Sequence, residues 1–144
     1  MTKVIHVLQD KAHHEIYTIR PEATVLEAIS LMADKGIGAL VVTDQNNHVV
    51  GILSERDYTR KIALMERSSY DTTVNEIMTA KVLTVTQSTS VEDCLSLMTD
   101  RHLRHLPVVE NDKLVGLVSI GDLVKAVMDD QRKLIDQLQQ YIAS

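Results

Sequence analysis

The chain contains the pattern Gly-x-x-Ser-x-x-Asp twice, as GILSERD at residues 51–57 and as GLVSIGD at residues 116–122. In both places an apolar run of the kind that forms a buried strand leads into the motif. A serine followed three positions later by an aspartate is typical of a helix start, where the two side chains cap backbone amides. Each copy of the pattern therefore predicts a strand that passes directly into a helix.

These two motifs belong to a longer internal repeat. Residues 18–57 return as residues 84–122, with identical residues 66 positions apart at first and 65 positions apart after one residue is lost in a turn. A period near 65 is longer than the roughly 20–50 residues of solenoid repeats. We therefore expect two similar subdomains packed as a pair, with the cleft between them as the natural place for a ligand.

Each copy is expected to fold in the order strand, helix, strand, strand, helix. A capping box at Thr24 and Glu27 opens the first helix of copy one, and Gly36 ends it. The apolar run at residues 39–42 predicts a strand that is buried on both faces. The fold class is thus α/β, with two pseudo-symmetric βαββα repeats and a long C-terminal helix. The other expected elements are strands at 16–19, 48–53, 82–85, 106–109 and 113–118, and helices that begin at Ser54 (to about Glu66), Ser90 and Ser119.

The repeat suggests four segments along the chain. Residues 1–66 hold an N-terminal extension and the first repeat, residues 67–73 form a polar linker, and residues 74–128 form the second repeat with a short lead-in helix. Residues 129–144 extend the last helix beyond its repeat. Apolar residues at 3–4 spacing continue along this helix, which predicts a homodimer or docking element; the alternative is a helix folded back on its own module. These residues are Val124, Val127, Leu134, Leu138 and Tyr141.

Composition narrows the class of protein. The chain has 144 residues, of which 44% are hydrophobic and 24% charged, as in an ordinary globular protein. A net charge of −5 argues against general binding to nucleic acid or anionic membranes. No apolar run approaches the ~20 residues of a membrane span, and the first residues lack a long apolar signal segment, so we expect a cytoplasmic protein. The single cysteine, Cys94, excludes an internal disulfide and occupies the place of Ala28 in the first copy.

The Ser-x-x-Asp motif has two interpretations. As a capping box it needs no ligand. At the same junction, however, free amides favour an anion, the serine can donate to a phosphate oxygen, and the aspartate can accept from two ribose hydroxyls. The glycine three residues before each serine, in the same strand context, favours the second interpretation. Arg56 adds a cation to the first motif, whereas Gly121 leaves room for close backbone approach in the second.

With these motifs the chain resembles a pair of CBS domains, the tandem repeat named after cystathionine β-synthase and also called a Bateman module. The resemblance extends from about Ile16 to Val127, and it is to the stand-alone members, because no catalytic or transport domain is attached. The segments that carry it are Pro21, IGALVV at 37–42, GILSERDY at 51–58, EIMT at 76–79, RHLPV at 104–108 and GLVSIGD at 116–122.

The resemblance implies regulatory binding of an adenosine compound, AMP or ATP in most members and an NAD-type ligand in some. In such modules the motif serine meets phosphate and the aspartate meets ribose. The second strand of the same repeat begins beside the ligand, the opening strand of the opposite repeat lines the base, and Met78 is expected to contact adenine. The first site then takes Gly38, Ala39, Ser54, Arg56, Asp57, Met78 and Thr84, and the second takes Thr18, Ile19, Arg104, His105, Ser119 and Asp122.

Either site fits the pattern, and we favour the first because Arg56 adjoins the helix start. Arg104 has two open roles: to pair with Asp100 four residues earlier, or to reach phosphate. No metal site is expected, since the adjacent side chains of His13 and His14 point in different directions in any regular structure, and the pair His102 and His105 lacks a nearby cysteine or a third obvious ligand.

We expect no enzyme, because the chain has no phosphate-binding loop of the ATPase kind and no catalytic constellation. A weak nucleotide hydrolase is the enzymatic alternative. The other alternative to a nucleotide-binding regulator is a ligand-free assembly module that acts through its C-terminal helix.

Overall fold

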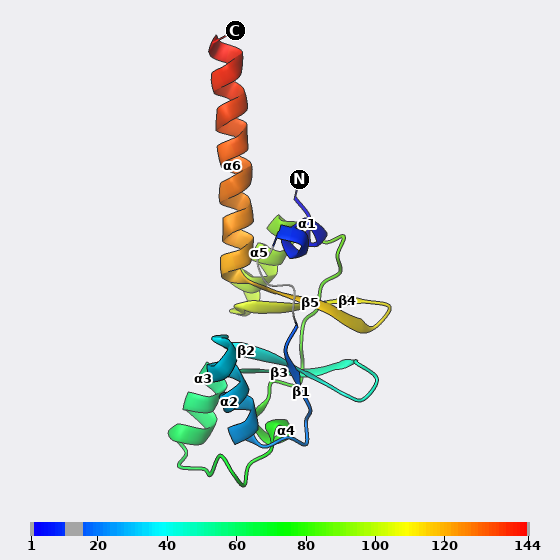
Figure 1. Ribbon diagram of the computed structural model, residues 1–144, viewed down its shortest axis with the longest axis vertical. Helices are drawn as coiled ribbons and strands as arrows, with labels where there is room; N and C mark the ends of the chain where they lie inside the picture. The colour runs from blue at the N-terminus through cyan, green and yellow to red at the C-terminus, as the bar shows by residue number, and fades with distance from the viewer. Residues whose placement is uncertain (1, 11–15, 144) are drawn as a thin grey trace. The chain divides into compact units, whose positions relative to one another are not determined.

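The computed structural model describes residues 2–10 and 16–143, and Figure 1 labels its helices and strands. The α/β class, the repeated elements and the long C-terminal helix expected from the sequence are confirmed. The elements are α1 (Val4–Asp10), β1 (Thr18–Ile19), α2 (Val25–Lys35), β2 (Ala39–Thr43), β3 (Val49–Ser54), α3 (Glu55–Tyr58), the π-helix η1 (Thr59–Ala63), α4 (Val74–Ile77), α5 (Val91–Arg101), β4 (His105–Glu110), β5 (Lys113–Ser119) and α6 (Ile120–Ala143).

The chain divides into two compact units that alternate along the sequence. The first-copy unit comprises Glu15–Leu83 and Val109–Val115, and the second-copy unit comprises Met1–His14, Thr84–Val108 and Gly116–Ser144, counting only the described residues of each range. Helix α1 therefore belongs to the unit of the second copy, and α4 belongs to the unit of the first.

The first-copy unit is built on a three-stranded sheet in the order β1-β2-β3, parallel between β1 and β2 and antiparallel between β2 and β3. Every residue of β2 is buried, as its continuous apolar sequence predicts. Helix α2 begins at the expected capping box, in which Thr24 Oγ1 accepts from Glu27 N at 3.1 Å, and it ends at Gly36 with a φ of 66°. The core comprises Val25, Ala28, Met32, Leu40, Val42, Leu53, Ile62, Val74 and Ile77.

Helices α1 and α4 are attached to their units in the same way. In each, the first two amides of the helix donate to two carbonyls just before another helix of that unit, α2 for α4 and α5 for α1. These bonds are Val74 N to Ala23 O (2.8 Å) and Asn75 N to Pro21 O (2.9 Å) for α4, and Val4 N to Thr89 O (2.9 Å) and Ile5 N to Gln87 O (3.0 Å) for α1. The two helices are therefore equivalent parts of the two units.

In the second-copy unit, the expected strand at residues 82–85 is reduced to one parallel bridge between Val85 and Val108. Val85 N donates to Pro107 O at 3.0 Å. A parallel ladder would next require the amide of residue 107 to donate to Leu83, and proline has no amide hydrogen. The sequence of the partner strand thus stops the ladder after one residue.

The helix after Ser54 also differs from the expected one. Its α-helical part is four residues long, and Leu64 N then donates to Thr59 O at 3.0 Å, five residues earlier, which makes the π-helix η1. Helical structure ends at Ala63 because the chain soon turns at Glu66, whose φ is 52°.

Burial distinguishes the start of α6 from its end. Leu123 is fully buried, and Thr2 Oγ1 donates to Asp130 Oδ2 at 2.6 Å. From Gln131 to Ala143 every residue is exposed, and in Figure 1 this part of α6 extends past the other elements of its unit.

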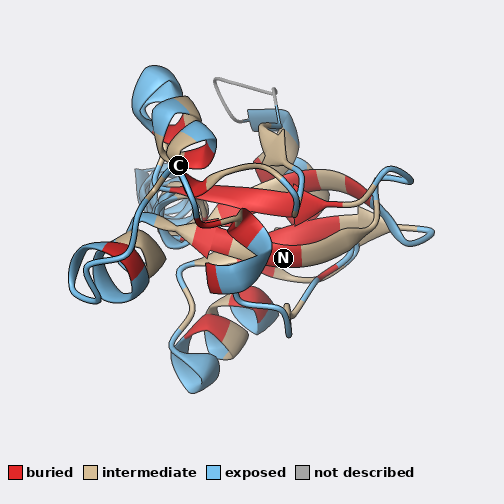
Figure 2. Cartoon of the chain, turned by 90° about the horizontal axis from the view of Figure 1, so that it is seen from below, coloured by how far each residue is buried: buried red, intermediate tan, exposed pale blue. Residues whose placement is uncertain are grey.

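In Figure 2 the buried residues follow the strands, while the outer turns of the helices are exposed. None of the described helices is both long enough and apolar enough to cross a membrane.

Candidate functional site

The first motif forms a compact junction between β3 and α3. Ser54 N donates to Asp57 Oδ2 at 2.9 Å, and Asp57 N donates to Ser54 Oγ at 3.2 Å, so the expected capping box is present. Glu55 N donates to Gly38 O at 3.0 Å, and Ala39 pairs with Ser54 across the sheet. The fold therefore brings together four of the predicted residues, Gly38, Ala39, Ser54 and Asp57.

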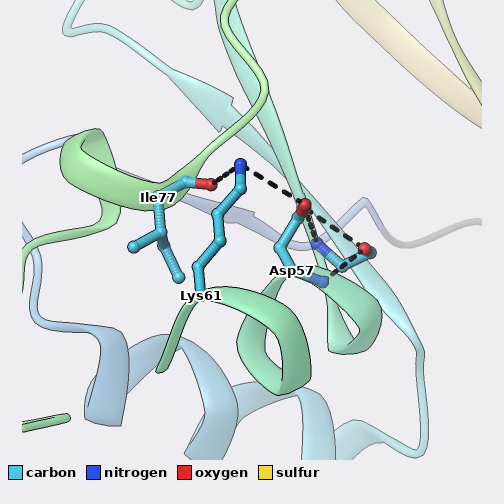
Figure 3. A network of polar contacts seen from close by, with 4 residues as sticks. Asp57, Lys61 and Ile77 are labelled. Carbon is cyan, nitrogen blue, oxygen red and sulfur yellow. Dashed lines mark hydrogen bonds and ion pairs between the residues drawn. The ribbon is translucent and has the colours of Figure 1, made fainter. Parts of the chain in front are cut away.

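The carboxylate of Asp57 is part of a wider polar network, shown in Figure 3. Its Oδ2 accepts from Ser54 N, and its Oδ1 lies 3.7 Å from Lys61 Nζ. The same ammonium group donates to Ile77 O at 2.8 Å. Lys61 thus connects the first motif to the end of α4, although 16 positions separate it from Ile77 in the sequence.

Met78 lies beside the glycine of the first motif. A methyl group added at Gly51 would meet Met78 Sδ and would lie 3.1 Å from Thr79 O. Thr79 is itself fixed to β3, because its amide donates to Ile52 O at 2.9 Å and its carbonyl accepts from Ile52 N at 3.0 Å. Met78 is half-buried and packs against the core, so it supplies an apolar wall on the strand that leads to Ser54.

The second motif repeats this geometry with other side chains. Ser119 N donates to Asp122 Oδ2 at 2.9 Å, and Asp122 N donates to Ser119 Oγ at 3.1 Å. Ile120 N donates to Arg104 O at 2.9 Å, which is the counterpart of the bond between Glu55 and Gly38. The predicted pair Arg104 and His105 is therefore next to the motif, with Arg104 exposed and His105 at the start of β4.

The remaining predicted residues lie in the elements expected for them. Thr18 and Ile19 form β1 and pair with β2, and both are half-buried. Thr84 is exposed and belongs to the second-copy unit, whereas the motif at Ser54 belongs to the first-copy unit. Its contribution to the first site stays a prediction. Arg56 is exposed on the first turn of α3.

Sequence reasoning missed two side chains that lie beside the motifs. Leu8 occupies in the second-copy unit the place of Met78, since a methyl group added at Gly116 would lie 2.7 Å from Leu8 Cδ2. The signal was present in the sequence: Val4 and Val74, like Leu8 and Met78, are 70 positions apart. The other missed side chain is Lys61. Its position four residues after Asp57 indicates that the two side chains can meet on a helix, but nothing in the sequence indicates its hydrogen bond to Ile77 O.

Cys94 and the histidines are the other candidate reactive groups of the sequence. Burial raises the pKa of the Cys94 thiol to about 11, with a smaller contribution from Asp93, so the thiol is neutral at ordinary pH. Among the described residues no group of three or more His, Cys, Asp or Glu side chains is placed to hold a metal ion. The pair His13-His14 lies outside the described residues. The described residues contain no ion pair between Arg104 and Asp100, so that role of Arg104 is not supported.

Both the matching family model and similar solved structures are of CBS domains. Residues 7–64 and 74–129 each match the family model described as the CBS domain. A solved structure of a protein with CBS domains from Burkholderia ambifaria MC40-6 is 52% identical, with a TM-score of 0.85 over 90% of this chain and 96% of that one. A structure of CBSX2 in complex with AMP is 26% identical, with a TM-score of 0.73 over 88% of this chain and 97% of that one.

The relatives include proteins longer than this chain. The mitochondrial CBS domain-containing protein CBSX3 of Arabidopsis thaliana is 43% identical over 123 residues. That match covers 83% of this chain and 60% of the plant protein. The chain thus spans about three fifths of the length of this relative.

Proposed function

The chain belongs to the CBS domain family, and on that premise we propose that it is a regulatory module that binds an adenosine nucleotide and modulates another protein. The observation that carries the proposal is the duplicated junction. In both repeats the same capping box forms although many of the flanking residues differ, and each is anchored to the carbonyl that precedes the neighbouring strand. The AMP complex of CBSX2 supports the choice of ligand class.

In this proposal each junction has a phosphate side and a ribose side. Ser54 and Ser119 donate to phosphate, and Asp57 and Asp122 accept from ribose hydroxyls. The side chain of Asp57 is 17% exposed, so it is accessible to a ligand while it caps the helix. The other groups proposed to line the two sites are Gly38, Ala39, Arg56, Met78 and Thr84 for the first, and Thr18, Ile19, Arg104 and His105 for the second.

AMP and ATP are the proposed ligands, with NAD as a further member of the class, and the proposal includes no catalysed reaction. A ligand can act on a partner only by binding two conformations of the module with different affinity. The linker at residues 67–73, α4 and α6 are the proposed moving parts. The cytoplasmic location expected from the sequence is also part of the proposal, and imaging of the tagged chain in its cell tests it.

Calorimetric titration of AMP, ATP and NAD tests the proposal. The wild type is compared with Asp57→Ala, Asp122→Ala and the double variant, on protein shown to be folded and ligand-free. Micromolar binding, about −8 kcal/mol, is expected for the wild type and is lost in the double variant. Glu27→Ala is the matched control, because it removes the acidic member of a capping box on α2 and should leave binding unchanged. Silence from every nucleotide would reduce both motifs to helix caps.

A second function is favoured by the exposed apolar side chains of α6, for which we propose a second copy of the chain as the partner. Their 3–4 spacing suits a self-complementary helix seam, and Gln131 is a polar residue within it of the kind that fixes register. Deleting residues 131–144 should abolish a dimer seen by light scattering and leave nucleotide binding intact. A full-length chain that is monomeric at high micromolar concentration would contradict this. The exposed apolar residues are Val124, Met128, Leu134, Ile135, Leu138, Tyr141 and Ile142.

A further inference from the structure

Lys61 places a positive charge beside the aspartate of the first motif. Its ammonium group lies 3.7 Å from Asp57 Oδ1 and donates to Ile77 O at 2.8 Å (Figure 3). The hydrogen bond to the carbonyl holds the ammonium group beside the carboxylate instead of leaving it to move freely in solvent. The carboxylate that is proposed to accept from ribose therefore has a fixed positive neighbour.

The ion pair between Lys61 and Asp57 adds little to the stability of the fold, so stability does not explain why the lysine is there. The side chain of Lys61 is 45% exposed, and ion pairs at that exposure contribute little to the free energy of folding. The second copy forms its junction with capping distances that agree within 0.1 Å, 2.9 and 3.1 Å against 2.9 and 3.2 Å, and has Ala126 at the position equivalent to Lys61, 65 residues later. Because the junction is built without a lysine there, the lysine is not needed to build it.

We propose that Lys61 makes the first motif selective for phosphorylated adenosine ligands over adenosine itself. The proposal rests on the proposed function, because it concerns ligands bound at Asp57. The charge has two effects, and the second of them sets the selectivity. The ammonium group draws electron density at Asp57 Oδ1 and so weakens it as an acceptor for the ribose hydroxyls, which AMP and adenosine share, so this effect lowers both affinities alike. It also attracts the phosphate of AMP at a distance of about 8–10 Å, which is close to the Debye length at ordinary ionic strength, so the attraction is partly screened and grows as salt is lowered.

The second motif has Ala126 at the equivalent position, so the contribution of this lysine to selectivity is specific to the first motif. Residues 119–126 contain one basic residue, Lys125, whereas residues 54–61 contain Arg56, Arg60 and Lys61. The second motif has Arg104 and His105 beside it, so its affinity for phosphate depends on other side chains than that of the first motif.

The test measures the ratio of AMP affinity to adenosine affinity by calorimetry. Asp122→Ala is the background for the first motif, so that Ser54 and Asp57 alone report binding. In this background Lys61→Met should lower the ratio about five- to tenfold, as expected for one charge acting on a phosphate dianion near a protein surface. Lys61→Arg keeps the charge and should keep the ratio. A urea denaturation curve of each variant confirms that it is folded.

Two further variants separate a specific role from a general charge effect. Arg60→Met removes the same charge from the adjacent, exposed residue of η1 and should change the ratio less than twofold. Ala126→Lys, in an Asp57→Ala background, should raise the ratio for the second motif.

An unchanged ratio in Lys61→Met, with both ligands still bound, overturns the proposal and leaves the nucleotide-binding function standing. An equal fall in Arg60→Met also overturns it. Failure of the wild type to bind any adenosine ligand overturns both proposals together.

Discussion

The two units share a backbone arrangement and differ in the side chains around it. In both, a strand leads to Ser-x-x-Asp, the first helical amide donates to the carbonyl before the neighbouring strand, and a short helix packs beside the motif glycine. Around this frame the first-copy unit has Lys61 and Met78, and the second-copy unit has Ala126 and Leu8. The residues that build the junction are thus repeated, and the residues that would select a ligand are not.

Several equivalent positions of the two units share the same burial, and the pair that differs in charge is exposed. Leu40 and Leu106, which are 66 positions apart, are both completely buried, as are Ala28 and Cys94. Arg56 and Gly121, which are 65 positions apart, are both exposed. Packing constrains volume at interior positions of both units, whereas a surface position beside the motif is free to acquire or lose a charge.

The largest expected effect comes from the core position that the two units share. Leu40→Ala and Leu106→Ala should each lower the free energy of unfolding by about 2–5 kcal/mol, because each removes a completely buried side chain and leaves a cavity. Urea denaturation monitored by circular dichroism measures both. If one variant loses several kcal/mol and the other loses nothing, the two cores are not equivalent.

Substitution of the two motif glycines is expected to destabilise the two units by different amounts. Gly51→Ala is expected to cost about 1–3 kcal/mol, because the new methyl group meets Met78 and the backbone carbonyl of Thr79, which two hydrogen bonds hold in place. Gly116→Ala is expected to cost about 1 kcal/mol or less, because its close neighbours are the terminal methyl groups of Leu8, at 2.7 and 2.9 Å, which can rotate away.

Thermal and urea denaturation of the two variants give the comparison. Gly121→Ala is the control, since an added methyl group there meets no described atom nearer than Ser119 Oγ at 3.7 Å. A larger loss at Gly116 than at Gly51 would show that α1 is held more rigidly than the segment after α4.

The two caps are expected to contribute equally. Ser54→Ala and Ser119→Ala each remove the hydroxyl that accepts from the aspartate amide, at 3.2 and 3.1 Å, and should each cost about 1 kcal/mol. Denaturation in urea without nucleotide measures this structural contribution by itself. A cap that could be removed at no cost would mean that its serine is retained for the ligand alone.

The sequence predicted the parts of the fold that depend on local pattern. The buried strand β2, the cap of α2 at Thr24 and its end at Gly36 follow from residues within a few positions of each other. The two junctions were also predicted, as capping boxes with Gly38 or Arg104 beside them. These are short-range consequences of side-chain chemistry.

The contacts that depend on distant segments were not predicted. Val4 donates to Thr89, and Lys61 to Ile77, and neither pairing is visible in a local hydrophobic pattern. The loss of the strand at residues 82–85 depends on Pro107, more than 20 positions away. The π-helical turn after Tyr58 likewise has no simple sequence signal.

The smallest effect is expected for the substitution of Cys94. This variant tests whether the cysteine gives the second-copy unit a function that the first-copy unit lacks. Cys94→Ala gives α5 the residue that α2 has at the equivalent buried position, Ala28, and should cost about 1 kcal/mol or less. In the wild type, burial raises the pKa of the Cys94 thiol from 9.0 to about 11. The folded state therefore favours the neutral thiol, and this contribution to stability is fully present below pH 9.

Above pH 9 the unfolded chain gains stability by ionising its thiol, so the contribution of the neutral thiol disappears as pH rises from about 9 to about 11. Wild type should consequently lose free energy of unfolding over that range relative to Cys94→Ala, which differs from it only in this side chain. A thiol reagent at pH 8 should label the native protein slowly and the urea-unfolded chain at once. Rapid labelling of the native protein would instead make Cys94 an accessible thiol, and the second unit would then carry a reactive group that the first does not.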